Sequence, residues 1–332
     1  MELVESLTIF LRDVKCTKRG EDVVITVDSP GDLQVARSAV DAALALGAHP
    51  TLLMYPSQSE AHKEPPATIA EAIKSADVWI EFAVQYILYS EARQEATKHG
   101  SRYACLSGMD TEMCVRTIGQ VDQSKVMMMG DVLVRLFTEA QEIIVTSKKG
   151  THIVAQMSSE AHQSGKIAAY PGDVVMLSGQ SCHLPIVESI QGTIVIDGVI
   201  WPLSEIGILD NTVELRIKSG MIVGIDGGDE AAQYRRWLAS HDDPELYKMA
   251  HYCYGFNPGV QNPSGRIIED ERVFGALTFG FGSTPEVNAA SHTDCVVLKP
   301  SVTLDGVALL EDGVFVPAEL NSICAELGVP GY

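Results

Sequence analysis

Positive charge is scarce in this sequence of 332 residues. Lys and Arg together number 24, whereas Asp and Glu number 44, which gives a net charge of −20 with histidine neutral. A surface this acidic repels nucleic-acid phosphates and anionic lipid headgroups. We therefore expect neither a nucleic acid nor a membrane as a partner. A neutral small molecule suits such a surface better than an anionic one.

Long apolar runs and paired cysteines are also lacking. No uninterrupted run of 18 apolar residues occurs, so the sequence predicts no membrane-spanning helix. Glu2 and Glu5 stand where a secretory signal would carry Lys or Arg, and residues 1–15 are predicted to form an amphipathic helix instead. The seven cysteines include no C-x-x-C pair, and their odd number favours a reduced, cytoplasmic protein over a disulfide scaffold or a zinc ribbon.

Several motifs of nucleotide-binding and hydrolytic sites are absent. The first strand–turn–helix segment, VITVDSPGDLQVAR, contains no G-x-G-x-x-G, and the chain has no G-x-x-x-x-G-K-[ST]. Neither of these phosphate-binding loops of nucleotide-binding proteins is therefore present. The G-x-S-x-G and H-E-x-x-H motifs are missing as well. We therefore expect the chemistry to lie in the second half of the chain.

Strand-like and helix-like segments alternate up to residue 141, and short strands separated by Gly, Asp, Asn and Ser dominate after it. Alternation is typical of βαβ units and a parallel sheet, whereas the later pattern predicts antiparallel hairpins. The predicted fold is α/β with mixed β: a Rossmann-like parallel α/β domain at 1–141 and a β-rich, antiparallel or mixed metal-binding domain at 142–332. The predicted helices are 32–47, 68–76, 90–100, 124–141 and 230–241, and the predicted strands of the first half are 21–30, 50–56, 77–84 and 102–108.

A histidine and a carboxylate two residues apart begin one probable strand, SHTDCVVLKP. The side chains of His292 and Asp294 should lie on the same face of that strand, where they could bind a metal ion. Three pairs of the form H-x-[DE] occur in the chain, so the pattern alone is weak. The other two, at 62–64 and 241–243, lie in polar stretches that look solvated.

His251 is the candidate for a third ligand. It lies in an aromatic and Gly-rich segment, YKMAHYCYGFNPGVQNPSG, and a core histidine bonded to a carbonyl is the alternative. Two imidazoles and one carboxylate on one face of an ion form the facial triad of non-haem Fe(II) oxygenases, which leaves coordination positions open for substrate and O2. Zn and Mn remain alternatives at this point.

The chain from about Tyr170 to its end resembles the metalloproteins that include the thermophilic (M29-type) aminopeptidases. It resembles more closely their iron-dependent relatives, the 2,5-dihydroxypyridine 5,6-dioxygenases of nicotinate catabolism. The similarity covers most of the chain and is weaker in the N-terminal half. The stretches that carry it are GTIVIDGVIWP, VELRIKSGMIVGIDGG, DDPELYKMAHYCYGFNPGV, EDERVFGALTFGFGSTPEVN and SHTDCVVL.

The resemblance implies that His251, His292 and Asp294 hold one Fe(II), with Zn, Mn or Co as alternatives and O2 as co-substrate. In the aminopeptidases a Glu stands at the position of His251 and a His at the position of Thr278, so a two-metal peptidase site is less favoured here. The dioxygenases carry an acid–base histidine where this chain has Tyr89, so the resemblance makes Tyr89 the candidate acid–base group, with a tyrosine at the surface between the two predicted domains as the alternative. A phenol, with its pKa near 10, is a poorer base than an imidazole.

Further candidates have less support. Asp173 matches a metal-binding Glu of the aminopeptidases and is proposed as an accessory ligand, with a plain turn residue as the alternative. His183 and Glu188 are candidates to line the substrate pocket, with an exposed hairpin as the alternative, and Tyr254 could pack on a flat ring, with a core position as the alternative. Cys253 and Cys295 flank the ligands and could form a Cys/His zinc site, but we expect both to be small buried hydrophobic residues.

The sequence is compatible with three functions. The first is a mononuclear non-haem Fe(II), extradiol-type dioxygenase that cleaves 2,5-dihydroxypyridine or a related hydroxylated aromatic or N-heterocyclic ring. The second is an M29-like aminopeptidase or amidohydrolase with one or two divalent metals, and the third is a binding protein without activity. The His at position 251 favours the first. By analogy with the family we also expect a homo-oligomer.

Overall fold

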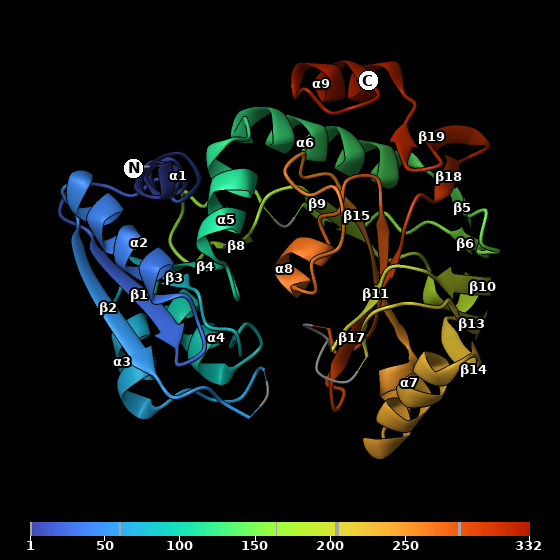
Figure 1. Ribbon diagram of the computed structural model, residues 1–332, viewed down its shortest axis with the longest axis horizontal. Coiled ribbons are helices and arrows are strands. Elements are labelled where there is room, and N and C mark those ends of the chain that lie inside the picture. The colour runs from blue at the N-terminus through green and yellow to red at the C-terminus, as the bar shows by residue number, and fades with distance from the viewer. Residues whose placement is uncertain (1, 60, 164, 203–205, 285–286) are drawn as a thin grey trace. The chain divides into compact units, whose positions relative to one another are not determined.

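The computed structural model describes residues 2–59, 61–163, 165–202, 206–284 and 287–332. It forms two compact units, coloured along the chain in Figure 1. Unit 1 contains Met1–Gln123 and Ser164–Ser178, and unit 2 contains Ser124–Gln163 and Gly179–Tyr332. This division falls earlier than the predicted boundary near residue 141, and the chain returns once to unit 1.

Unit 1 is built on a five-stranded sheet in the order β2-β1-β3-β4-β8. All four strand pairs are parallel, as the alternating pattern predicts. The last strand corrects one expectation: residues 174–176 belong to the segment predicted as the antiparallel or mixed second domain, but they pair in parallel with β4 in unit 1. The strands are β1 (Asp22–Asp28), β2 (His49–Tyr55), β3 (Val78–Glu81), β4 (Arg102–Cys105) and β8 (Val174–Met176), and the helical segments are α1 (Glu2–Ile9), η1 (Phe10–Val14), α2 (Leu33–Ala45), α3 (Ala67–Lys74), α4 (Glu91–Lys98), α5 (Thr111–Cys114) and η2 (Val115–Gly119).

In the first strand–turn–helix of unit 1, a side chain caps the N-terminus of the helix. The carboxylate of Asp32 accepts the backbone N–H groups of Gln34 and Val35 at 2.8 and 3.3 Å, and so caps helix α2 itself. A Cβ added to Gly31 would lie 2.5 Å from the Val27 side chain, so this glycine serves close packing of the turn. The helix N-terminus that binds phosphate in dinucleotide-binding folds is therefore occupied by a carboxylate.

Glu81, at the end of β3, is fully buried in unit 1. Its carboxyl group accepts hydrogen bonds from the Tyr103 hydroxyl and, at 3.1 Å, from the Ile87 N–H. Burial raises the pKa of Glu81 to about 8, although these two hydrogen bonds oppose the rise. The folded state therefore holds a proton here that the unfolded chain releases near its ordinary pKa.

We expect the Glu81→Gln variant to lose less stability than the wild type as the pH rises. A folded-state pKa above the unfolded value contributes stability that is complete below about pH 4.5 and is lost as the pH rises through about 8. Between pH 5 and 8.5 the unfolding free energy of the wild type should fall by roughly 2–4 kcal/mol relative to the variant, which cannot ionise. Urea titrations at several pH values measure this. The exposed Glu71→Gln is the control, and parallel curves for wild type and Glu81→Gln would contradict the prediction.

Unit 2 contains two antiparallel sheets, and its first hairpin, at 142–157, turns at Lys148–Gly150. The eight-stranded sheet has the order β14-β13-β10-β6-β5-β18-β19-β20, and the seven-stranded sheet has the order β12-β11-β17-β16-β15-β9-β7. Parallel and antiparallel sheets with helices are thus both present, which confirms the predicted fold class. No helix among the described residues has the length and apolar character to cross a membrane.

The elements of unit 2 follow in chain order. Helix α6 begins at Gln123 and otherwise belongs to this unit. The helical segments are α6 (Gln123–Glu139), η3 (Val187–Ser189), α7 (Asp229–Ser240), η4 (Pro244–Tyr247), α8 (Ile267–Asp270) and α9 (Ala318–Glu326), and the strands are β5 (Glu142–Thr146), β6 (His152–Gln156), β7 (Ala161–Gln163), β9 (Gln180–His183), β10 (Gln191–Ile196), β11 (Val199–Ile200), β12 (Gly207–Ile208), β13 (Val213–Lys218), β14 (Met221–Gly227), β15 (Met249–Gly255), β16 (Leu277–Gly282), β17 (His292–Val297), β18 (Ser301–Leu304), β19 (Val307–Glu311) and β20 (Val314–Phe315).

Candidate metal centre

Three side chains converge on one face of the seven-stranded sheet. Strand β15 supplies His251, and β17 supplies His292 and Asp294. The two histidine Nε2 atoms lie 3.1 Å apart, and each lies 3.3 Å from Oδ1 of Asp294. Among the residues that the structure describes, these three are the only group of His, Cys, Asp and Glu side chains whose ligand atoms lie close enough to hold a metal ion.

The strand between them explains this convergence. In β16, Gly280 lies opposite His251 on one side and opposite Asp294 on the other. A β-bulge between Met249 and His251 shifts the register of β15 just before the histidine. A Cβ at Gly280 would lie 2.2 Å from Nε2 of His251, so the site exists only because this strand position carries no side chain.

The hydrogen-bond partners favour one tautomer of each neutral imidazole. Nδ1 of His292 lies 2.8 Å from the Ser283 carbonyl oxygen, which can only accept, so Nδ1 donates and Nε2 carries a lone pair. Nδ1 of His251 lies 3.1 Å from Sγ of Cys253, which is bonded to a second sulfur and has no hydrogen to give. The Nε2 atom of His251 therefore also presents a lone pair.

Three acceptors that point at one another repel, and a cation between them removes that repulsion. Ligand atoms about 2.1 Å from one ion and at right angles to each other lie about 3 Å apart, which the observed triangle matches. Two imidazoles and one carboxylate suit a borderline cation such as Fe(II), Mn(II) or Zn(II). The residues present thus fit a single divalent metal ion.

Charge and exposure at the cluster agree with this fit. Burial alone would raise the pKa of Asp294, but the neighbouring imidazoles His292 and His251 outweigh it and hold the pKa well below its usual value. Burial alone would lower the pKa of His292. The charge of Asp294 and the hydrogen bonds to Asp294 and to the Ser283 backbone outweigh burial and raise this pKa. The side chain of His251 is 22% exposed and that of Asp294 only 5%, so the cluster has an anchored side and an open side.

Glu271 is a buried carboxylate beside the cluster that sequence reasoning missed. Burial is the main cause that raises the pKa of Glu271, and the negative charge of Asp294 raises it further. The two carboxylates therefore lie near each other. The guanidinium of the fully buried Arg272 bonds Glu271 at 2.9 Å and lowers its pKa in turn. The sequence signal was the run EDER, whose four residues are all buried although such runs are usually solvated.

The residues predicted to contact a substrate in unit 2 lie elsewhere. His183 and Tyr254 are buried on the opposite face of the same sheet, where both rings pack against Phe137 of α6. Burial lowers the pKa of His183 to about 3, so it stays neutral in the core. Glu188 is exposed in the short helix η3. These placements argue against their predicted contact with a substrate and give His183 and Tyr254 a packing role.

Tyr89 and Asp173 belong to unit 1. The ring of Tyr89 packs against His62 with the ring centroids 4.7 Å apart, and His62 also meets Tyr86 edge-on. His62 is thus half-buried among tyrosines, which corrects the expectation that it is solvated. Asp173 accepts the Tyr170 N–H at 2.8 Å in the turn before β8, in line with the alternative of a turn residue.

The cysteines depart from the expected reduced state. Cys182 of β9 and Cys253 of β15 lie directly opposite each other and form a disulfide bond. Cys295 is free and buried, as expected for a small hydrophobic residue. The bonded cysteines are 71 positions apart in the sequence, and the pairing of β9 with β15 brings them together. Sequence spacing could not show this.

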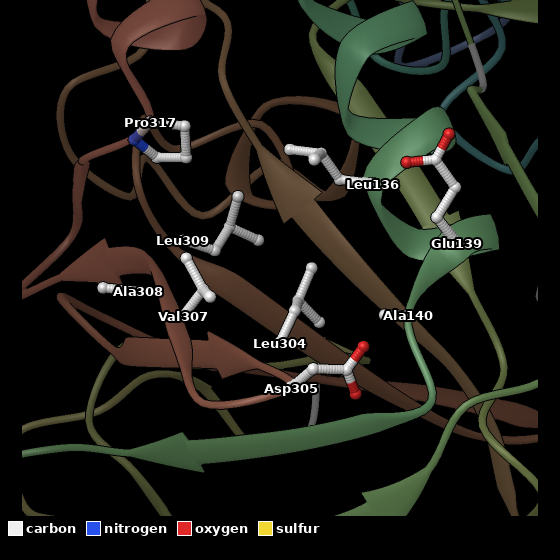
Figure 2. Close-up of a pocket in the computed structure, with 9 residues that line it drawn as sticks. All are labelled: Leu136, Glu139, Ala140, Leu304, Asp305, Val307, Ala308, Leu309 and Pro317. Atoms are coloured by element: carbon white, nitrogen blue, oxygen red, sulfur yellow. The ribbon is translucent and has the colours of Figure 1, made fainter.

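A separate cavity of about 260 Å³ lies in unit 2 between the end of α6 and the hairpin β18–β19 (Figure 2). Leu136, Leu304 and Leu309 line it, and none of the three converging ligands does. Its Asp305 caps the backbone, because the carboxylate accepts the N–H groups of Gln141 and Glu142. The cavity is therefore an apolar hollow apart from the metal centre.

The fold and the site together define a class: α/β proteins with a parallel unit, an antiparallel unit and a His–His–Asp cluster on the antiparallel sheet. The sequence profile of the 2,5-dihydroxypyridine 5,6-dioxygenases matches residues 6–317, and the chain belongs to that family. The curated 2,5-dihydroxypyridine 5,6-dioxygenase of Pseudomonas putida (strain KT2440) is 25% identical over 270 residues, which cover 75% of this chain and 73% of that protein.

Two solved structures show the same fold. The structure of 2,5-dihydroxypyridine dioxygenase from Pseudomonas putida KT2440 superposes with a TM-score of 0.83 at 21% identity, over 96% of this chain and 98% of that chain. Wild-type AmpT from Thermus thermophilus gives a TM-score of 0.67 at 14% identity, over 95% of this chain and 99% of that chain. These structures support the fold, and the sequence profile carries the family assignment.

Proposed function

We propose that this chain is a ring-opening dioxygenase that uses one Fe(II) held by His251, His292 and Asp294. The substrate we propose is 2,5-dihydroxypyridine or a closely related hydroxylated N-heteroaromatic ring. The observation that carries the proposal is the triangle of three lone-pair atoms above Gly280, 3.1–3.3 Å on each side. Membership of the dioxygenase family supports the reaction type.

The chain's own residues set the charge of this site. Asp294 is held ionised and an imidazole binds a metal in its neutral form, so a divalent ion bound by the three residues would keep one uncompensated positive charge. That charge favours the ionised form of a ring hydroxyl. The nearby carboxylate Glu271 adds little net charge, because Arg272 pairs with it. Bound Fe(II) would supply open coordination positions for the ring hydroxyl and O2 and the redox coupling between them.

Positioning comes from the sheet. His292 is held by the Ser283 carbonyl, and His251 by the sulfur of Cys253, so both rings are oriented before a ligand arrives. The open side at His251 is the side that a flat ring can approach. Tyr89 stays the predicted acid–base group on the basis of its match to the family's histidine, and His62 offers an imidazole next to it within unit 1. Self-association also stays a prediction.

An oxygen-uptake assay tests the proposed function. The protein is loaded with Fe(II) without oxygen, mixed with 2,5-dihydroxypyridine or a panel of mono- and dihydroxypyridines, and then exposed to O2. We expect one O2 to be consumed for each ring lost, with loss of the aromatic absorbance. Release of amine from aminoacyl anilides with Zn, Co or Mn would instead support the hydrolase alternative. The absence of activity in both assays would contradict the proposal.

A further inference from the structure

A disulfide bond lies directly behind one of the three proposed ligands. Cys182 and Cys253 face each other in antiparallel register with their Cα atoms 4.1 Å apart. Cys253 follows His251 by two residues in β15, so both side chains leave the same face of the strand. Sγ of Cys253 lies 3.1 Å from Nδ1 of His251, on the side of the ring away from the other ligands.

The oxidation state of Cys253 decides what its sulfur can do for His251. A disulfide sulfur has no hydrogen, so it can only accept from Nδ1, and the lone pair of Nε2 then faces His292 and Asp294. A reduced Cys253 carries an S–H that can donate to Nδ1. The hydrogen of the neutral ring would then lie on Nε2, which is the nitrogen that must bind the metal. The disulfide has no hydrogen to donate to Nδ1, so it favours the tautomer with hydrogen on Nδ1.

We propose that the Cys182–Cys253 disulfide is a redox-sensitive positioning element that holds His251 in its metal-binding tautomer. Reduction by a thiol reductant breaks the S–S bond, forms two S–H groups with two electrons and two protons, and leaves the reductant as a disulfide. Partners behind a metal-binding histidine typically change metal affinity 10–100-fold. We therefore expect the reduced protein to bind the metal about tenfold more weakly. The inference rests on the proposed metal site.

The first experiment counts the thiols of the full-length wild type and measures its metal affinity. Rapid alkylation of the untreated, unfolded protein should modify the five free cysteines, and prior reduction should raise the number to all seven. Mn(II) affinity is then measured by the electron paramagnetic resonance signal of the free ion, before reduction and after anaerobic removal of the reductant. Mn(II) is a suitable probe because it prefers oxygen and nitrogen ligands to thiols.

Variants separate this effect from a general loss of structure. Cys182→Ala leaves a thiol at position 253 and should bind Mn(II) as weakly as the reduced wild type. Cys324→Ala removes another buried cysteine of unit 2 and should match the oxidised wild type. Selective 15N labelling of histidine reports the tautomer: the His251 signal, assigned by its loss in His251→Ala, should show hydrogen on Nδ1 in the oxidised protein and on Nε2 in a substantial share of the reduced protein.

The outcomes distinguish the inference from the proposed function. Seven thiols in the untreated protein, or equal Mn(II) affinity and an unchanged His251 tautomer after reduction, would overturn the positioning role and leave the metal site intact. Absence of Mn(II) binding in both oxidation states would overturn the metal site and the inference with it. A tenfold loss shared by reduction and Cys182→Ala, with normal melting curves, supports the inference.

Discussion

The Gly280→Ala variant should fold but lose the metal centre. The added methyl group would lie 2.2 Å from Nε2 of His251 and 2.4 Å from Cε1, much closer than non-bonded atoms approach. Strand β16 cannot retreat, because β15 and β17 hold it on both sides. The His251 ring must therefore swing away and leave two ligands. We expect metal affinity to fall at least 100-fold and turnover to disappear, at a cost in stability of about 1–3 kcal/mol.

Metal content after dialysis against a weak chelator, together with a melting curve, measures both parts of this prediction. Gly228→Ala is a matched control, because it adds the same methyl group to unit 2 where the nearest side-chain atom is 3.7 Å away. That variant should keep its metal and its activity. A Gly280→Ala protein with equimolar metal and normal turnover would show that the three side chains do not share one ion.

Local sequence patterns could predict part of this site. The two-residue spacing of His292 and Asp294 places both on one strand face, and the structure confirms that placement. The same alternation, applied to β15, already puts Tyr254 on the face opposite His251, so its predicted contact with a substrate conflicted with the strand pattern. An interior glycine in TFGFG was a further signal of close approach, and Gly280 proves to be the position on which the convergence depends.

Other features depend on which strands become neighbours, and no local pattern shows that. His251 joins the pair only because β16 lies between β15 and β17, and the resemblance to the dioxygenases, not the residues alone, pointed to it. The short run at 174–176 suits a parallel or an antiparallel sheet equally well, and its partner β4 decides. The disulfide likewise follows from the pairing of β9 with β15.

The His292→Ala variant should lose both metal and turnover while its fold stays nearly intact. The imidazole supplies one of three ligand atoms, and its removal leaves a bidentate site on a partly exposed surface. We expect the bound metal to fall below about a tenth of the wild-type amount and turnover to fall by at least about 10³-fold. The lost hydrogen bond to the Ser283 carbonyl should cost only about 1 kcal/mol of stability. Elemental analysis, oxygen uptake and melting curves measure the three effects.

The matched control is His241→Ala, because His241 and Asp243 show the same H-x-D pattern in the same unit. His241 also makes an Nδ1 contact with a carbonyl oxygen, that of Trp237 at 2.9 Å. Its carboxylate partner is used differently: Asp243 accepts the backbone N–H groups of Glu245 and Ala290, and among the described residues it belongs to no group of three or more side chains that could hold an ion. The control should keep its metal and its turnover. If both variants lose activity equally, or if His292→Ala keeps its metal, the assignment of the centre is wrong, because among the described residues only the motif at 292–294 meets a third ligand.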